Sequence, residues 1–154
     1  MTMTNAIPYG VRVLKDLRYG TAHARQALDL YLPPGSGPWP VIVWVHGGAF
    51  RLGSKEGPLP AEYLNEGFAI ASLSYRLSQH AIWPAQTVDC KAGVRWLRAH
   101  AAEYGLDPGR FVAWGTSGGG HLSAMLGVSG HVRDWEQGAH LEHSSRVQAV
   151  VDWF

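Results

Sequence analysis

A serine set among glycines is the part of this sequence that most clearly indicates chemistry. The apolar run Phe111 to Trp114 is followed at once by Gly115-Thr116-Ser117-Gly118-Gly119, which fits G-x-S-x-G, and then by a helical pattern. A serine becomes a useful nucleophile when a sharp strand-to-helix turn strains its backbone and presents its hydroxyl to a base and a carbonyl group. We therefore predict that Ser117 is the nucleophile and that it occupies a sparsely populated backbone region at such a turn.

Two alternatives compete with this interpretation of the glycine-rich turn. The chain has 19 glycines, so the pattern also fits a helix start packed tightly on a strand. A dinucleotide-binding turn fits less well, because Ser117 stands where G-x-G-x-x-G needs its second glycine.

A second glycine-rich segment follows another predicted strand. His46-Gly47-Gly48-Ala49-Phe50 comes directly after the apolar run Val41 to Val45. Consecutive glycines let backbone N–H groups approach a ligand closely, so this segment is a candidate oxyanion hole. The alternative is an ordinary glycine turn beside a histidine with satisfied hydrogen bonds.

The composition bounds the class of protein. With 154 residues, 46% hydrophobic and 16% charged, the chain predicts one globular domain over residues 1–154. A net charge of +1 excludes a nucleic-acid partner, and no apolar run is long enough for a membrane span. The single cysteine, Cys90, cannot form an internal disulfide and is expected to be a packed residue of a cytoplasmic protein.

The elements that must position the two glycine segments alternate between strands and helices. Two strands, Val11 to Tyr19 and Gln26 to Leu32, are predicted to form a hairpin. The other predicted elements are strands at Val41 to Val45, Phe68 to Leu73, Phe111 to Trp114 and Val147 to Trp153, and helices at Ala61 to Glu66, at Ala85 to Glu103 with Gly105 as C-cap, and from Ser117 to Val128. We read Leu106 to Pro108 as a turn. This order predicts an α/β fold, a mostly parallel sheet with flanking helices opened by an antiparallel hairpin.

In this order, the segments HGGAF, SYRL, GTSGGGHLSA and VVDWF resemble the α/β-hydrolase fold. Within it they resemble the hormone-sensitive-lipase-like carboxylesterases, including those related to acetyl-xylan and feruloyl esterases. The resemblance implies a serine carboxylesterase (EC 3.1.1 type) that acts on a small-molecule ester through an acyl-serine intermediate, with no cofactor. It implies Ser117 as nucleophile and an oxyanion hole of Gly47, Gly48 and Gly118. It also implies supporting roles for His46, Ala49, Tyr75, Arg76 and Asp89.

The sequence departs from this family in the catalytic acid and base. In the α/β-hydrolase fold both follow the nucleophile on loops after later strands, and we expect this chain to lack those strands. Asp134, Glu136, Asp152, His131, His140 and His143 follow Ser117, but none comes after a later strand of its own. His121 lies one turn beyond Ser117, and we expect its ring to point away from the site. The alternative function is therefore a catalytically inactive fragment or a binding module with the same fold.

Two further expectations concern metals and partners. The pair His140-x-x-His143 has no accompanying ligand motif, so no metal site is predicted, and both rings are expected in solvent. The segment Val147 to Trp153 would be an exposed sheet edge, which predicts a homo-oligomer formed through that edge.

Overall fold

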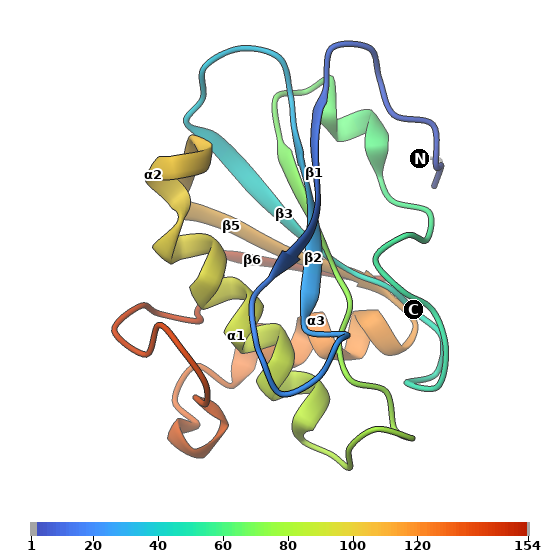
Figure 1. Cartoon of the computed structure of the whole chain (residues 1–154), viewed down its shortest axis with the longest axis vertical. Helices are drawn as coiled ribbons and strands as arrows, with labels where there is room; N and C mark the ends of the chain where they lie inside the picture. Colours follow the sequence, from blue (N-terminus) through green and yellow to red (C-terminus); the bar gives the residue numbers. More distant parts are fainter. Residues whose placement is uncertain (1–2, 154) are drawn as a thin grey trace.

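The computed structural model describes residues 3–153, which form one six-stranded sheet with the order β1-β2-β4-β3-β5-β6 (Figure 1). The strands are β1 Arg12–Arg18, β2 Ala27–Leu32, β3 Trp39–Val45, β4 Ala69–Leu73, β5 Leu106–Thr116 and β6 Ala149–Trp153. β1 and β2 form the predicted antiparallel hairpin, and β2 is also antiparallel to β4. The other three pairings are parallel. The predicted mostly parallel sheet opened by a hairpin is confirmed.

The helices are α1 Ala85–Ala99, α2 Ala101–Tyr104 and α3 Gly118–Val128, with 3-10 turns η1 Ala61–Leu64 and η2 Arg133–Trp135. The single helix predicted from Ala85 to Glu103 is divided at His100, whose ring stacks on Trp96 with the ring centroids 4.1 Å apart. Gly105 ends α2 in the left-handed conformation, with φ 68°, as predicted.

Three further predictions of local structure were wrong. The helix expected at Ala61 to Glu66 is a 3-10 turn over Ala61–Leu64. The turn expected at Leu106 to Pro108 belongs to β5, because Leu106 pairs with Trp39 before the register shifts. At the other end of the sheet β6 begins at Ala149 and not at Val147, and Val147 packs partly buried against the core.

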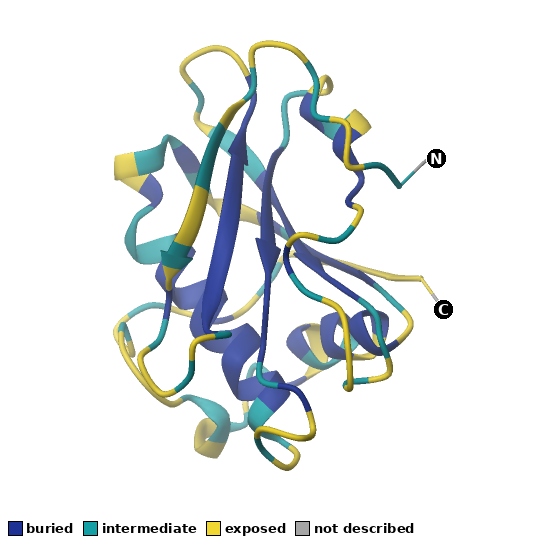
Figure 2. Cartoon of the chain, turned by 45° about the vertical axis from the view of Figure 1, so that its right-hand side comes forward, coloured by how far each residue is buried: buried dark blue, intermediate teal, exposed yellow. Residues whose placement is uncertain are grey.

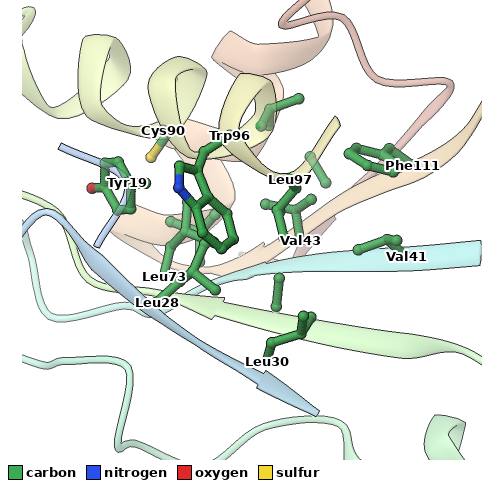
Figure 3. Packing of buried hydrophobic residues seen from close by; sticks show 14 of the residues in the cluster. Tyr19, Leu28, Leu30, Val41, Val43, Leu73, Cys90, Trp96, Leu97 and Phe111 are labelled. Carbon is green, nitrogen blue, oxygen red and sulfur yellow. The ribbon is translucent and has the colours of Figure 1, made fainter. Parts of the chain in front are cut away.

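The central strands are covered on both faces. Val41, Val43 and Val45 of β3 point into the larger core, beneath α1 and α3. Figure 3 shows part of this core under α1. Ile42 and Trp44 point to the opposite face, where Leu64 of η1 closes a smaller core. Burial on both faces explains why β3 is a continuous apolar run.

Both edges of the sheet are exposed (Figure 2). β1 alternates between half-buried and exposed side chains, and every residue of β6 is exposed. In β6, Val150 and Asp152 face α3, because Cβ atoms on Gly127 and Gly120 of that helix would collide with their side chains. Val151 and Trp153 lie on the opposite face of the strand. The predicted exposed edge is confirmed. Within residues 3–153 no helix has the length and apolar character needed to cross a membrane.

Candidate active site

Ser117 lies at the turn between β5 and α3 with φ 52° and ψ −123°. A non-glycine residue at positive φ costs about 1–3 kcal/mol and persists only where its surroundings hold it. Here the Ser117 N–H donates to the Trp153 carbonyl (3.0 Å), and the Ser117 carbonyl accepts from the His121 N–H (3.1 Å). The backbone geometry predicted for Ser117 is confirmed.

The two glycines of the G-x-S-x-G pattern leave room for this turn. A Cβ on Gly119 would lie 2.0 Å from the Val45 carbonyl oxygen, and one on Gly115 would lie 2.2 Å from the Gly119 carbonyl oxygen. No side chain fits at either distance. The turn is therefore packed directly against the end of β3.

The loop after β3 is built around a buried histidine. The Tyr75 hydroxyl donates to the His46 carbonyl (3.0 Å), and the two rings stack with centroids 4.4 Å apart. The His46 Nε2 atom lies 3.4 Å from Arg25 Nη2, and Nδ1 lies 2.7 Å from the Gly47 carbonyl oxygen. Because a guanidinium can only donate, Nε2 accepts and Nδ1–H donates, which is the neutral ring.

Burial lowers the pKa of His46 to about 4, with a smaller contribution in the same direction from the Arg25 charge and an opposing one from the hydrogen bond to Gly47. His46 is therefore neutral at pH 7, and its two ring nitrogens are occupied away from Ser117. The supporting position expected for His46 and Tyr75 agrees with these contacts.

The same loop brings backbone N–H groups to the nucleophile turn. Ala49 and Phe50 both have positive φ, 51° and 60°. A Cβ on Gly118 would lie 3.4 Å from the Phe50 nitrogen and 3.5 Å from the Ala49 nitrogen. Within the described residues, the N–H groups of Ala49, Phe50 and Gly118 donate no hydrogen bond. Three free donors therefore meet beside Ser117.

The predicted donors Gly47 and Gly48 lie just before these residues in the loop. A Cβ on Gly47 would lie 2.9 Å from the Thr116 carbonyl oxygen, so Gly47 allows the loop to pack on the end of β5. Gly48 has φ 119°, and its carbonyl accepts from the Arg51 and Leu52 N–H groups in a tight turn. The sequence alone did not indicate that the Phe50 N–H is a free hydrogen-bond donor here. Phenylalanine rarely adopts a left-handed backbone, so its residue type gives no hint of this conformation.

Arg76 and Asp89 form a largely buried ion pair behind this loop. Arg76 Nε and Nη2 lie 2.7–3.1 Å from the two Asp89 carboxylate oxygens. Asp89 also accepts from the Arg76 N–H (2.9 Å) and from Gln26 Nε2 (2.8 Å). This pair fixes the chain after β4 to α1, consistent with the expected supporting role.

Among residues 3–153, no histidine is hydrogen-bonded to the Ser117 hydroxyl. The His121 ring packs between the rings of Phe50 (5.7 Å) and Trp83 (5.4 Å). It therefore contacts the loop after β3, whereas we expected it to point away from the site. His140 and His143 are half-buried and not fully exposed as expected. The ring of His140 lies 5.3 Å from that of His100. No group of three metal-ligating side chains occurs in the described chain.

Comparison with known proteins places this geometry in a family. The BD-FAE family profile matches residues 28–154. The probable carboxylic ester hydrolase LipM of Mycobacterium tuberculosis is 32% identical over 90% of this chain and 33% of its own length. The probable isoprenylcysteine alpha-carbonyl methylesterase ICMEL1 of Arabidopsis thaliana is 35% identical over 86% of this chain and 28% of its own.

Solved structures give the same result. A truncated form of a carbohydrate esterase from gut microbiota superimposes with a TM-score of 0.86 and 33% identity, over 92% of this chain and 56% of the other. The chain spans about a third of the length of the two curated relatives, LipM and ICMEL1. Over the matched residues, the fold is that of the α/β-hydrolase esterases.

Proposed function

Since this chain belongs to the BD-FAE family of α/β-hydrolase esterases, we propose that it hydrolyses carboxylic esters through an acyl-serine intermediate on Ser117. One observation carries the proposal: a serine held at φ 52° has three free backbone N–H groups beside it, from Ala49, Phe50 and Gly118. We propose that this arrangement serves as a nucleophile elbow and its oxyanion hole.

In this mechanism Ser117 Oγ attacks the ester carbonyl carbon and its proton passes to a base. The carbonyl oxygen becomes an oxyanion that accepts hydrogen bonds from the free N–H groups, and the alcohol leaves with a proton. Water then attacks the acyl-serine and releases the acid. His46 does not take part as a base, because its ring is neutral, buried and hydrogen-bonded to the loop.

The base and the acid must come from outside the described residues, because no histidine within them is bound to Ser117. We propose that residues 1–154 form a single domain that carries the nucleophile and oxyanion hole only. The same observation favours a second candidate function, an inactive or purely binding module of this fold. We also propose a cytoplasmic location, supported by the lone buried Cys90, and a homo-oligomer formed through β6.

Hydrolysis of p-nitrophenyl acetate separates the two functions. Loss of triad members costs about a millionfold in rate, so the chain alone should show only residual turnover. Added imidazole, a soluble base, should increase that turnover and should do so through Ser117. With imidazole present as the base, a fluorophosphonate probe should label Ser117, as found by peptide mass spectrometry.

The matched control is Ser117→Ala, which removes only the hydroxyl. Rates are compared with those of imidazole alone, which hydrolyses this ester by itself. Turnover above that of imidazole alone, or probe labelling of the protein, that persists in Ser117→Ala would contradict the proposal. An imidazole response absent from both proteins, with no labelling, would favour the binding module.

A further inference from the structure

Arg25 lies in the turn between β1 and β2, and its guanidinium group joins that turn to two other segments. Nε donates to the Tyr75 carbonyl (2.7 Å) after β4. Nη2 donates to the Gly53 carbonyl (2.6 Å) and to His46 Nε2 (3.4 Å). Because Nη2 carries two N–H groups, each of these acceptors has a donor of its own. The hairpin is therefore tied to the loop after β3 and to the chain after β4.

The acceptors of Nη2 are the two ends of the loop that carries the free N–H groups of Ala49 and Phe50. This loop begins at His46 and closes at Gly53, where a Cβ would lie only 2.5 Å from His46 Nδ1. Gly53 has φ 88°, a conformation that favours glycine. One nitrogen of Arg25 thus holds both ends of a closed loop whose middle residues face the nucleophile turn.

The contact with His46 also decides which of its ring nitrogens carries the proton. A guanidinium group only donates, so Nε2 must accept and the proton lies on Nδ1. Nδ1–H in turn donates to the Gly47 carbonyl (2.7 Å). A trans peptide group is planar, so fixing this carbonyl also fixes the direction of the Gly48 N–H. This peptide group is close to the nucleophile, because a Cβ on Gly47 would lie 3.5 Å from Ser117 Cβ.

Arg25 differs from Arg76 in the kind of group that it binds. Arg76 pairs with the Asp89 carboxylate. Among residues 3–153, the guanidinium group of Arg25 donates only to neutral acceptors, two carbonyl oxygens and a ring nitrogen. Its planar fork sets the directions of these hydrogen bonds, which an ammonium group on a flexible stem does not do. Arg25 therefore acts on the loop through directed hydrogen bonds.

We propose that Arg25 is a positioning residue of the oxyanion hole, which closes the loop of residues 46–53 and sets the tautomer of His46. Through these contacts it holds the free N–H groups of the loop in the direction of the reacting carbonyl oxygen. The inference rests on the proposed function, because an ester at Ser117 is what gives these N–H groups an acceptor. Arg25 acts through the loop and not on the ester itself.

The His46 tautomer tests this role without substrate. It is read from the ring nitrogen shifts in long-range NMR spectra of the whole chain. We expect Nδ1–H in the unmodified chain, and a change to the Nε2–H form in Arg25→Met, which removes the donors and leaves Nε2 without a partner. If the unmodified chain carries the proton on Nε2, Arg25 does not donate to that atom. That result would overturn the inference even if Arg25→Met does not fold.

The labelling rate of Ser117 tests whether the loop geometry depends on Arg25. The rate is measured with a fluorophosphonate in the presence of imidazole. In Arg25→Met it should fall about 10–100-fold, since a small misplacement of a site group from a distant change costs up to about a hundredfold. A folded Arg25→Met variant with an unchanged tautomer, or with an unchanged rate in a chain that is labelled, would overturn the inference.

Arg18→Met is the matched control within the same hairpin. The Arg18 guanidinium group also donates three hydrogen bonds, to the carbonyls of Gly20, His23 and Ala24 at 2.7–3.0 Å, but all three lie in the hairpin turn itself. This variant should leave the His46 tautomer and the labelling rate unchanged. Equal changes in the Arg18 and Arg25 variants would overturn the inference, because any loosening of the hairpin would then have the same effect.

Ser117→Ala separates this test from that of the proposed function. It should keep the Nδ1–H form of His46, because the contacts from Arg25 to Gly47 do not include the serine. An unmodified chain that is never labelled at Ser117 would contradict the proposed function. A His46 tautomer that does not depend on Arg25 would contradict the inference instead.

Discussion

Single residues in this site act mainly through their backbone. The serine nucleophile, the three free N–H groups and the glycines around them depend on conformations and close contacts that a substituted side chain would disturb. The side chains that support them, His46 and Tyr75, are buried and bind the same loop. Changes at these positions should therefore affect stability and site geometry together.

Gly119→Ala should destabilise the fold by about 3 kcal/mol or more, because a Cβ 2.0 Å from the Val45 carbonyl oxygen would force apart α3 and β3. Urea unfolding followed by circular dichroism measures the change. Gly57→Ala is the control, since its Cβ would meet only the Ser54 carbonyl oxygen at 3.3 Å, and it should shift stability by less than about 1 kcal/mol. Similar midpoints for the two variants would show that the turn is not packed as described.

The buried His46 ring should make stability depend on pH. Its folded pKa of about 4 is below the ordinary histidine value of 6.5, so below pH 6.5 the unfolded chain binds a proton that the folded chain does not. Stability should therefore fall as the pH is lowered from 6.5 to 4, by about 3 kcal/mol in total. An NMR titration should show the His46 ring unprotonated at pH 5.5, and a midpoint near 6.5 would contradict the assigned contacts.

At the residue scale, the sequence predicted those site residues whose type is unusual at their position, and it did not predict those whose type is common there. The position of Ser117 between glycines predicts its strained backbone. The pair Gly47-Gly48 predicts that the backbone approaches another group closely. Arg25, which binds His46, lies in the hairpin turn 21 positions earlier and has no local pattern. Phe50 at φ 60° is equally unmarked, because its conformation is imposed by the loop and not by its own preference.

Among the elements, α1 organises the irregular segment that follows α3. Lys91, Arg95 and Arg98 lie at helical spacing on one face and bind carbonyl groups of that segment, at Ser129, Gln137, Ala139, Ser144 and Arg146. Partial burial would raise the pKa of Glu136, but hydrogen bonds from Lys91 and Ser145 lower it. The segment is therefore fixed by charges on its neighbour and not by its own secondary structure.

Glu136→Gln should destabilise the protein by about 3–5 kcal/mol, because it leaves two buried cations without their carboxylate. Thermal and urea unfolding both measure this. Glu142→Gln removes a carboxylate from the same segment whose side chain is 69% exposed, and it should change stability by less than about 1 kcal/mol. A mild effect at Glu136 would mean that the cluster is more hydrated than its burial indicates.

The central strands were predictable because their apolar runs are nearly continuous, and the hairpin strands because their residues alternate and are followed by Gly20 and Pro33. The segment from residue 129 to 146 was not, since its order comes from contacts with α1 across 40 or so positions. For the same reason the sequence did not predict that His140 and His143, which were expected in solvent, are half-buried. A helical pattern such as α1 shows its buried face but not which loop will cover it.

At the scale of the whole chain, β6 lies at one edge of the sheet formed by the described residues, and we propose that this edge governs association. Its Val151 and Trp153 side chains lie on the face away from α3 and are 37% and 43% exposed, beside unpaired backbone groups. An edge of this kind is a template for pairing with another strand. Two copies joined across a two-fold axis would cover both edges at once.

We therefore expect the chain to sediment as a dimer or larger oligomer at micromolar concentration. Val151→Lys should shift it towards monomer, because a charge on the edge opposes strand pairing. Val128→Lys, at a position 66% exposed at the end of α3, should leave the oligomer intact. A well-folded monomer of the unmodified chain would show that the edge remains open in solution.

The hydrogen bond from the Ser117 N–H to the Trp153 carbonyl also sets an order of events during synthesis. Ser117 leaves the ribosome before β6, and the strained turn has no partner for this N–H until β6 has emerged and paired with β5. A nascent chain stalled before residue 149 should therefore hold a serine with a relaxed backbone. The strained geometry of Ser117 is thus expected to form only once β6 has paired with β5, and to be absent while that strand is unpaired.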